Sequence, residues 1–225
     1  ECKKNAGLYI GFQSPLSKHE LRQHIEQQTL RNVLQFVPVK PFDYFEIAPG
    51  TIHAVGPDVL LLEPQKVLNG KEGKTYRVWD WGRLYDTEGK EDLKGTGRTL
   101  HVEESLKLID PTRQVGHAFI EKISKSPIIK NRPGSSTRLY PHNGLYQVML
   151  SEGDFADFTL HTDSPGYGFV ICLEGDVQIG NLTLIKGQSA FLPATCFPLQ
   201  IKWNNGGRVA CITTSSCFLE TLPPP

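Results

Sequence analysis

Three polar side chains in the first half of the chain are spaced so that they could share one site. His53 follows the turn Pro49-Gly50, and an apolar run over residues 59–62 then leads to Glu63 and Gln65. Glu63 and Gln65 lie two residues apart, so on a strand they share one face. A carboxylate there is costly unless it is paired, metal-bound or functional. This order predicts a metal site in the mouth of a small β-barrel. A histidine hydrogen-bonded in a barrel wall is the alternative.

Arg77 opens the next strand-like run, which reads TYRVWDWGR with its flanking residues. The planar guanidinium fork suits a phosphate or a developing oxyanion. His53, Glu63 and Arg77 together would therefore suit an anionic sugar substrate. An ion pair of Arg77 with Asp80 or Glu63, which would only brace the barrel, is the alternative.

Short helices and strands must position these residues. Alternating apolar residues predict a strand within residues 1–12. Ser17 and Glu20 have the spacing of a capping box, which predicts a helix that begins there. Thr29 is expected to cap a second short helix, so that the helical segment covers about residues 15–36.

Three further elements are expected before the middle of the chain. The continuous apolar run from Val59 to Leu62 predicts a strand buried on both faces, and Tyr76 to Trp79 predicts another. Residues 102–109 could form a helix with Leu106 and Ile109 on its apolar side.

Residues 140–219 form the clearest β region. Short apolar runs alternate with Gly, Asp, Asn and Pro, a spacing typical of a sandwich, a barrel or a jelly roll. Residues 39–50 parallel residues 184–194, since each has an apolar residue, a lysine, a turn and an aromatic strand that ends near proline. This weak internal repeat predicts two related barrels in tandem.

The composition of the chain limits the kinds of binding partner to expect. The 225 residues hold 24 Lys and Arg and 24 Asp and Glu, so the formal net charge is zero. That balance removes the electrostatic reason to expect broad binding to nucleic acid or to a membrane surface. The five cysteines form no C-x-x-C pair, which favours reduced thiols in a cytoplasmic protein. The chain starts at Glu1 and its only methionine is Met149, so it is expected to be part of a longer polypeptide.

The segments PGTIHAVG, LLLEPQ and TYRVWDWGR, followed by Arg98-Thr99-Leu100-His101, resemble the signature of type I mannose-6-phosphate isomerases. The resemblance involves about ten positions in order, and its upstream and downstream parts cover nearly all of the chain. It implies a mainly β fold with two tandem cupin (jelly-roll) barrels and a small helical segment. The expected domains are residues 1–83 as the remainder of a catalytic cupin, 84–139 as a connector of loop and helix, and 140–219 as a metal-free C-terminal cupin.

The resemblance also implies an activity. His53 would be a zinc ligand, Arg77 the active-site arginine, and Glu63 a pocket residue that contacts substrate hydroxyls or moves a proton. The reaction would interconvert mannose 6-phosphate and fructose 6-phosphate through an enediol, with one Zn²⁺ per chain. The residue acting as base does not follow from the sequence. A monomer or a weak homo-oligomer is expected.

Two departures from the family pattern bear on the site. The other zinc ligands of the family are expected upstream of residue 1, so the chain offers one ligand where three are needed. The segment from Gln65 to Lys71 also differs from the family and adds residues at the pocket rim. A cupin relative that binds a sugar phosphate without converting it is therefore the alternative, and a plain interaction domain is the third hypothesis.

Overall fold

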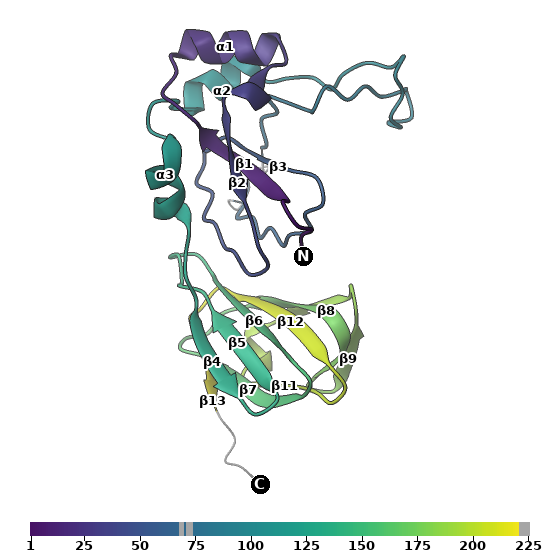
Figure 1. Ribbon diagram of the computed structural model, residues 1–225. Helices are drawn as coiled ribbons and strands as arrows, with labels where there is room; N and C mark the ends of the chain where they lie inside the picture. The colour runs from purple at the N-terminus through teal and green to yellow at the C-terminus, as the bar shows by residue number, and fades with distance from the viewer. Residues whose placement is uncertain (68–69, 71–73, 221–225) are drawn as a thin grey trace. The chain divides into compact units, whose positions relative to one another are not determined.

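The chain folds into two compact units, residues 1–125 and 126–225, which are described separately. The structure, a computed structural model, describes residues 1–67, 70 and 74–220 (Figure 1). More of these residues lie in strands than in helices, so the prediction of a mainly β fold is confirmed. The altered segment after Gln65 lies partly outside the described residues.

A three-stranded antiparallel sheet is the framework of the first unit. β1 (Gly7–Phe12) lies between β2 (Leu34–Pro38) and β3 (His53–Val55). Ile10 of β1 pairs with His53. Among the described residues, β3 is therefore an edge strand, and His53 stands at its first position.

The predicted N-terminal helix is confirmed as α1 (Lys18–Glu26). The Ser17 hydroxyl accepts a hydrogen bond from the Glu20 backbone N–H, and the Glu20 carboxylate accepts one from the Ser17 backbone N–H. This reciprocal cap satisfies backbone donors that a helix start leaves unpaired. Leu21 and Ile25, four residues apart, are both buried against the core of the unit.

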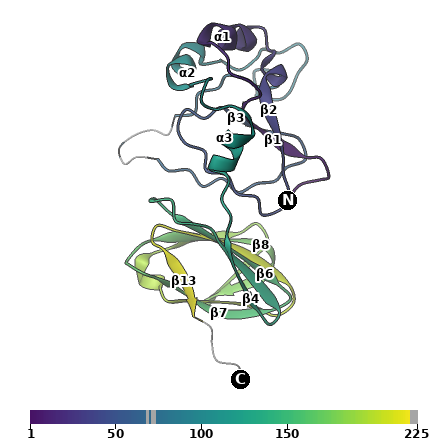
Figure 2. The same ribbon diagram turned by 60° about the vertical axis from the view of Figure 1, so that its left-hand side comes forward.

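Two more helices complete the first unit. α2 (Val102–Leu108) confirms the helix predicted over residues 102–109 and lies beside α1 (Figures 1 and 2). The Lys18 ammonium joins them by donating to the Leu106 carbonyl at 2.6 Å. α3 (Gly116–Ile123), which the sequence analysis did not distinguish from its connector, packs apolar side chains on the sheet beside Ile10.

Two predicted strands are absent from the part of the chain that the structure describes, and one predicted helix is shorter than expected. The run Val59–Leu62 is no strand, and Leu60 is 67% exposed. Its recorded backbone contacts within the described residues are with Glu1 and Cys2, and Leu61 and Leu62 are also exposed, so the run is not a strand buried on both faces. The run from Tyr76 to Trp79 is likewise irregular. The second short helix is a single 3-10 turn, η1 (Leu30–Asn32).

The second unit is a curled antiparallel sheet that wraps around one core (Figures 1 and 2). Its strand order is β13-β7-β11-β8-β12-β6-β5-β4, with β9 and β10 also paired to β8. The strands of this sheet are β4 (Ile128–Arg132), β5 (Ser135–Leu139), β6 (Gln147–Gly153), β7 (Ala156–Thr162), β8 (Gly168–Ile179), β9 (Leu182–Ile185), β10 (Ser189–Leu192), β11 (Leu199–Trp203), β12 (Gly207–Thr213) and β13 (Cys217–Glu220). A 3-10 turn, η2 (Ala194–Cys196), precedes β11.

Alternation along these strands builds the core of the second unit. Along β7, Ala156, Phe158 and Leu160 are buried while the residues between them are more exposed. Period-2 burial of this kind is what one covered face of a sheet requires. The curled sheet agrees with the jelly roll predicted for residues 140–219. The described residues of the first unit form only the three-stranded sheet, so two tandem barrels stay a prediction.

The cysteines follow the burial of their strands. All five are free, and Cys172, Cys211 and Cys217 are buried. No helix in the described part of the chain is long and apolar enough to cross a membrane.

Candidate functional site

A tight turn delivers His53 to the start of β3. Gly50 has φ of +82°, and a Cβ there would lie 2.8 Å from the Leu108 carbonyl oxygen, so glycine is the residue that fits. The Nδ1 atom of His53 lies 2.9 Å from the Thr51 carbonyl oxygen. Because a carbonyl only accepts, Nδ1 carries the proton, and a neutral ring keeps its lone pair at Nε2.

That lone pair faces a carboxylate. Nε2 of His53 lies 3.9 Å from Oε1 of Glu63, and the two side chains are 40% and 67% exposed. The two atoms form an ion pair only when the ring is protonated, and both are atom types that can coordinate a metal ion. The separation is below the roughly 4.2 Å sum of one Zn–N and one Zn–O bond, so both atoms can reach one ion. An anchored Nδ1 is also usual for a metal-bound imidazole.

A complete metal centre needs more than this pair. No group of three or more His, Cys, Asp and Glu side chains suited to a metal occurs within residues 1–67, 70 and 74–220. A catalytic zinc takes three protein ligands and leaves one position open. The donor chemistry of His53 and Glu63 thus fits part of a zinc site, and the described residues do not complete it.

Two hydrogen bonds with His101 hold the backbone of Arg77 in place. Its N–H donates to Nδ1 of His101 at 3.0 Å, and the His101 N–H donates to the Arg77 carbonyl at 2.8 Å. The Arg77 side chain is half-buried and has no ion pair with any described residue. The structure brings His53 and Glu63 together, but no recorded contact joins Arg77 to either of them.

Asp80, which the sequence analysis named only as a candidate partner of Arg77, is a charge centre for two other arginines. Its Oδ1 lies 2.5 Å from Nη2 of Arg83, and its Oδ2 lies 3.3 Å from Nε of Arg98. The hydrogen bond to Asp80 raises the pKa of the Arg83 guanidinium. Asp80 is thus engaged with two arginines other than Arg77, which argues against the bracing alternative. The three-residue spacing of Asp80 and Arg83 was the one available signal.

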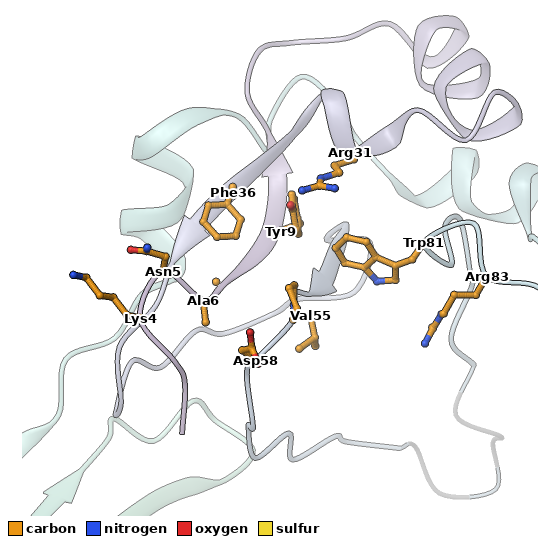
Figure 3. Close-up of a pocket in the computed structure, with 13 residues that line it drawn as sticks. Lys4, Asn5, Ala6, Tyr9, Arg31, Phe36, Val55, Asp58, Trp81 and Arg83 are labelled. Atoms are coloured by element: carbon orange, nitrogen blue, oxygen red, sulfur yellow. The ribbon is translucent and has the colours of Figure 1, made fainter. Parts of the chain in front are cut away.

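A hollow of about 720 Å³ opens in the same unit (Figure 3). Aromatic rings of Tyr9, Phe36 and Trp81 line it together with Arg31 and Lys4. None of the three predicted site residues is among its lining residues. The sequence analysis did not predict this hollow, because residues from four separate segments form it.

Comparisons with known proteins test the family resemblance stated from the sequence. No protein-family model matches the chain. Mannose-6-phosphate isomerase ManA of Bacillus subtilis is 33% identical over 135 residues, which are 58% of this chain and 39% of that protein. Mannose-6-phosphate isomerase of Streptococcus mutans is 37% identical over 93 residues, 41% of this chain and 26% of that protein. The chain is similar to mannose-6-phosphate isomerases. The resemblance predicted from the sequence is therefore confirmed.

Solved structures agree at the level of the fold. The crystal structure of mannose 6-phosphate isomerase from Bacillus subtilis superposes with a TM-score of 0.69 and 23% identity, over 95% of this chain and 62% of that one. A putative mannosephosphate isomerase from Archaeoglobus fulgidus gives a TM-score of 0.57 at 14% identity, over 96% and 59%. The matched part of the chain spans well under half of the curated mannose-6-phosphate isomerases named above.

Proposed function

We propose that the chain is part of a zinc-dependent aldose–ketose isomerase that interconverts mannose 6-phosphate and fructose 6-phosphate. The approach of His53 Nε2 to the Glu63 carboxylate carries the proposal, because it pairs a metal-type imidazole with an acid at 3.9 Å. The relatives named as mannose-6-phosphate isomerases support the substrate class. A small-molecule sugar phosphate is thus the proposed partner, and the cytoplasm the proposed location.

In this proposal each residue has one task. His53 would hold Zn²⁺ through Nε2, with Nδ1 oriented by Thr51. Bound zinc would supply polarisation of the substrate oxygens at carbons 1 and 2. Glu63 would accept a hydrogen bond from a substrate hydroxyl or move a proton between those carbons, in the enediol pathway. Arg77 would hold the phosphate or the developing oxyanion through its guanidinium fork.

The test is turnover of mannose 6-phosphate to fructose 6-phosphate by the purified protein, with added zinc and with a chelator. Zinc-dependent turnover that is lost on chelation is the expected result. Turnover that persists unchanged with chelator would contradict the metal-dependent part of the proposal.

One observation favours a second candidate function, a sugar-phosphate-binding relative without turnover. The described residues hold no group of three metal-ligating side chains. In that case mannose 6-phosphate would bind, zinc would not strengthen the binding, and no fructose 6-phosphate would form. Binding measured beside turnover therefore separates the two functions.

A further inference from the structure

One buried side chain bridges the turn that presents His53. Gln114 lies in the segment between α2 and α3 and is 8% exposed. Its Nε2 atom donates a hydrogen bond to the Gly50 carbonyl at 2.7 Å, and its Oε1 atom accepts one from the Ile52 N–H at 2.9 Å. A single amide group thus joins the residues on either side of Thr51, although it comes from a distant part of the sequence.

The amide of Gln114 fits this place in one orientation. The Ile52 N–H can only donate and the Gly50 carbonyl can only accept, so the glutamine must offer its oxygen to the first and its nitrogen to the second. A methionine has a similar length but would satisfy neither backbone group. Leaving such a group unpaired in a buried place is unfavourable, so the two hydrogen bonds hold the turn in one conformation.

The position of Gln114 is itself set by β1. The Phe12 N–H donates to the Gln114 carbonyl at 2.7 Å, and the Gly11 N–H donates to the Ile52 carbonyl at 3.0 Å. Gly11 has φ of +66°, and a Cβ there would collide with the Gln114 carbonyl oxygen, so glycine is needed for this close approach. The strand that pairs with His53 therefore also anchors the side chain that bridges its turn.

The hydrogen bond at Ile52 bears directly on the imidazole of His53. The Ile52 N–H and the Thr51 carbonyl belong to one peptide group, which is planar, so fixing the direction of one fixes the other. Oε1 of Gln114 accepts from the N–H of this group, and Nδ1 of His53 lies 2.9 Å from its carbonyl oxygen. Gln114 thus fixes the carbonyl that receives the Nδ1 proton.

We propose that Gln114 is a positioning residue for His53, which holds the peptide between Thr51 and Ile52 so that the imidazole keeps its proton on Nδ1 and its lone pair on Nε2. The proposal rests on the proposed function in one respect, the use of that lone pair to bind a metal ion. The choice of tautomer needs neither metal nor substrate, so it can be measured independently of both.

Nuclear magnetic resonance of the ring nitrogens measures the tautomer of His53 in the full 225-residue chain. The sample is treated with chelator and held at about pH 8.5, where histidine side chains are ordinarily neutral. The signals of His53 are those that disappear in His53→Gln. In the unchanged chain we expect the proton on Nδ1. In Gln114→Met, which removes both side-chain hydrogen bonds, we expect most of the population to carry the proton on Nε2.

The second unit offers a matched control. Gln147 makes the same pair of bonds, since its Nε2 donates to the Tyr140 carbonyl at 2.8 Å and its Oε1 accepts from the Cys217 N–H at 2.7 Å. Gln147→Met should therefore leave the tautomer of His53 unchanged. An unchanged tautomer in folded Gln114→Met, or an equal shift in Gln147→Met, would overturn the proposal.

A conservative variant keeps the test decisive if Gln114→Met does not fold. Gln114→Glu retains an oxygen for the Ile52 N–H, so it should keep the proton of His53 on Nδ1. Loss of this tautomer in folded Gln114→Glu, or a proton on Nε2 in the unchanged chain, would overturn the proposal.

Zinc affinity separates the role of Gln114 from the proposed function. Where the unchanged chain binds zinc, Gln114→Met should bind it about 10- to 100-fold more weakly, the usual effect of removing a group that orients a metal ligand. Equal zinc affinity despite a shifted tautomer would overturn the link to the metal. A tautomer that shifts as expected, in a chain without zinc-dependent turnover, would support the positioning role and contradict the isomerase function alone.

Discussion

His53 presents Nε2 to the Glu63 carboxylate at 3.9 Å, while the Thr51 carbonyl holds the other ring nitrogen. Both side chains are well exposed, so a plain ion pair would add little stability. The contact is therefore expected to contribute little to folding, and the proposed role of His53 is to bind a metal ion. The first prediction tests that difference.

His53→Gln should lower zinc affinity at least tenfold and remove turnover, with little change in stability, because it removes an exposed metal-type nitrogen. Zinc content by mass spectrometry and the free energy of unfolding in urea are the measurements. His117→Gln is the control, since His117 is 84% exposed on α3. A loss of stability of several kcal/mol in His53→Gln, with zinc content unchanged, would make His53 a structural residue.

Glu63→Gln tests the acid–base role, with zinc content measured beside kcat because the Glu63 carboxylate lies 3.9 Å from Nε2 of His53. The amide keeps the size and hydrogen-bonding capacity of the side chain but cannot carry a proton between carbons. General acid–base groups contribute about 10²- to 10⁴-fold, so kcat should fall within that range. If kcat stays unchanged and only KM rises, Glu63 contacts substrate hydroxyls without moving a proton.

Arg77→Ala should reduce kcat by about 10²- to 10³-fold, the usual loss of one group that stabilises developing charge. Zinc content should not change. The backbone bonds between Arg77 and His101 do not involve the arginine side chain, so the segment should keep its place. His101→Ala is the informative comparison, because it removes the acceptor of the Arg77 N–H. Loss of zinc from Arg77→Ala would show a structural role instead.

Asp80→Asn should destabilise the first unit by about 2 kcal/mol, because it removes the charge shared by Arg83 and Arg98. Arg98 also lies 4.3 Å from the centre of the Tyr85 ring, so the segment that contains Tyr85 should become easier to cleave. Urea unfolding and limited proteolysis measure the two effects. Asp92→Asn is the control, as the Asp92 carboxylate bonds to the local backbone N–H of Lys94. Equal stability of Asp80→Asn and the control would contradict this account.

Local signals predicted local structure well. The capping box of Ser17 and Glu20 reappears at the start of α1, because residues close in sequence decide a helix start. The short apolar runs predicted over residues 140–219 reappear as strands such as β7, because each finds a neighbouring strand in the sheet. The run Val59–Leu62 failed for the opposite reason: a strand needs a partner, and an apolar run does not specify one. The same limit applies to the site. The pairing of His53 with Glu63 could be anticipated from their order, whereas Arg98 reaches Asp80 only through a long return of the chain.

The buried thiols of the second unit should make the protein less stable at alkaline pH. Burial raises the pKa of Cys211 and Cys217 above their ordinary value of 9.0, so both stay neutral in the native barrel. Below about pH 9 the native and unfolded thiols are protonated alike, and stability does not depend on them. As the pH rises above 9, the unfolded chain releases protons that the native chain keeps, so the free energy of unfolding falls.

Cys211→Ala isolates this effect. Each fully buried thiol contributes a slope of about 1.4 kcal/mol per pH unit above its unfolded pKa. The variant should be less stable at pH 7, because it leaves a small cavity, but should lose less stability between pH 9 and pH 10. Cys196→Ala is the matched control, since Cys196 is only half-buried and lies in η2. Urea unfolding at several pH values gives the slopes. An unchanged slope in Cys211→Ala would mean that native Cys211 reaches water and ionises before the barrel unfolds.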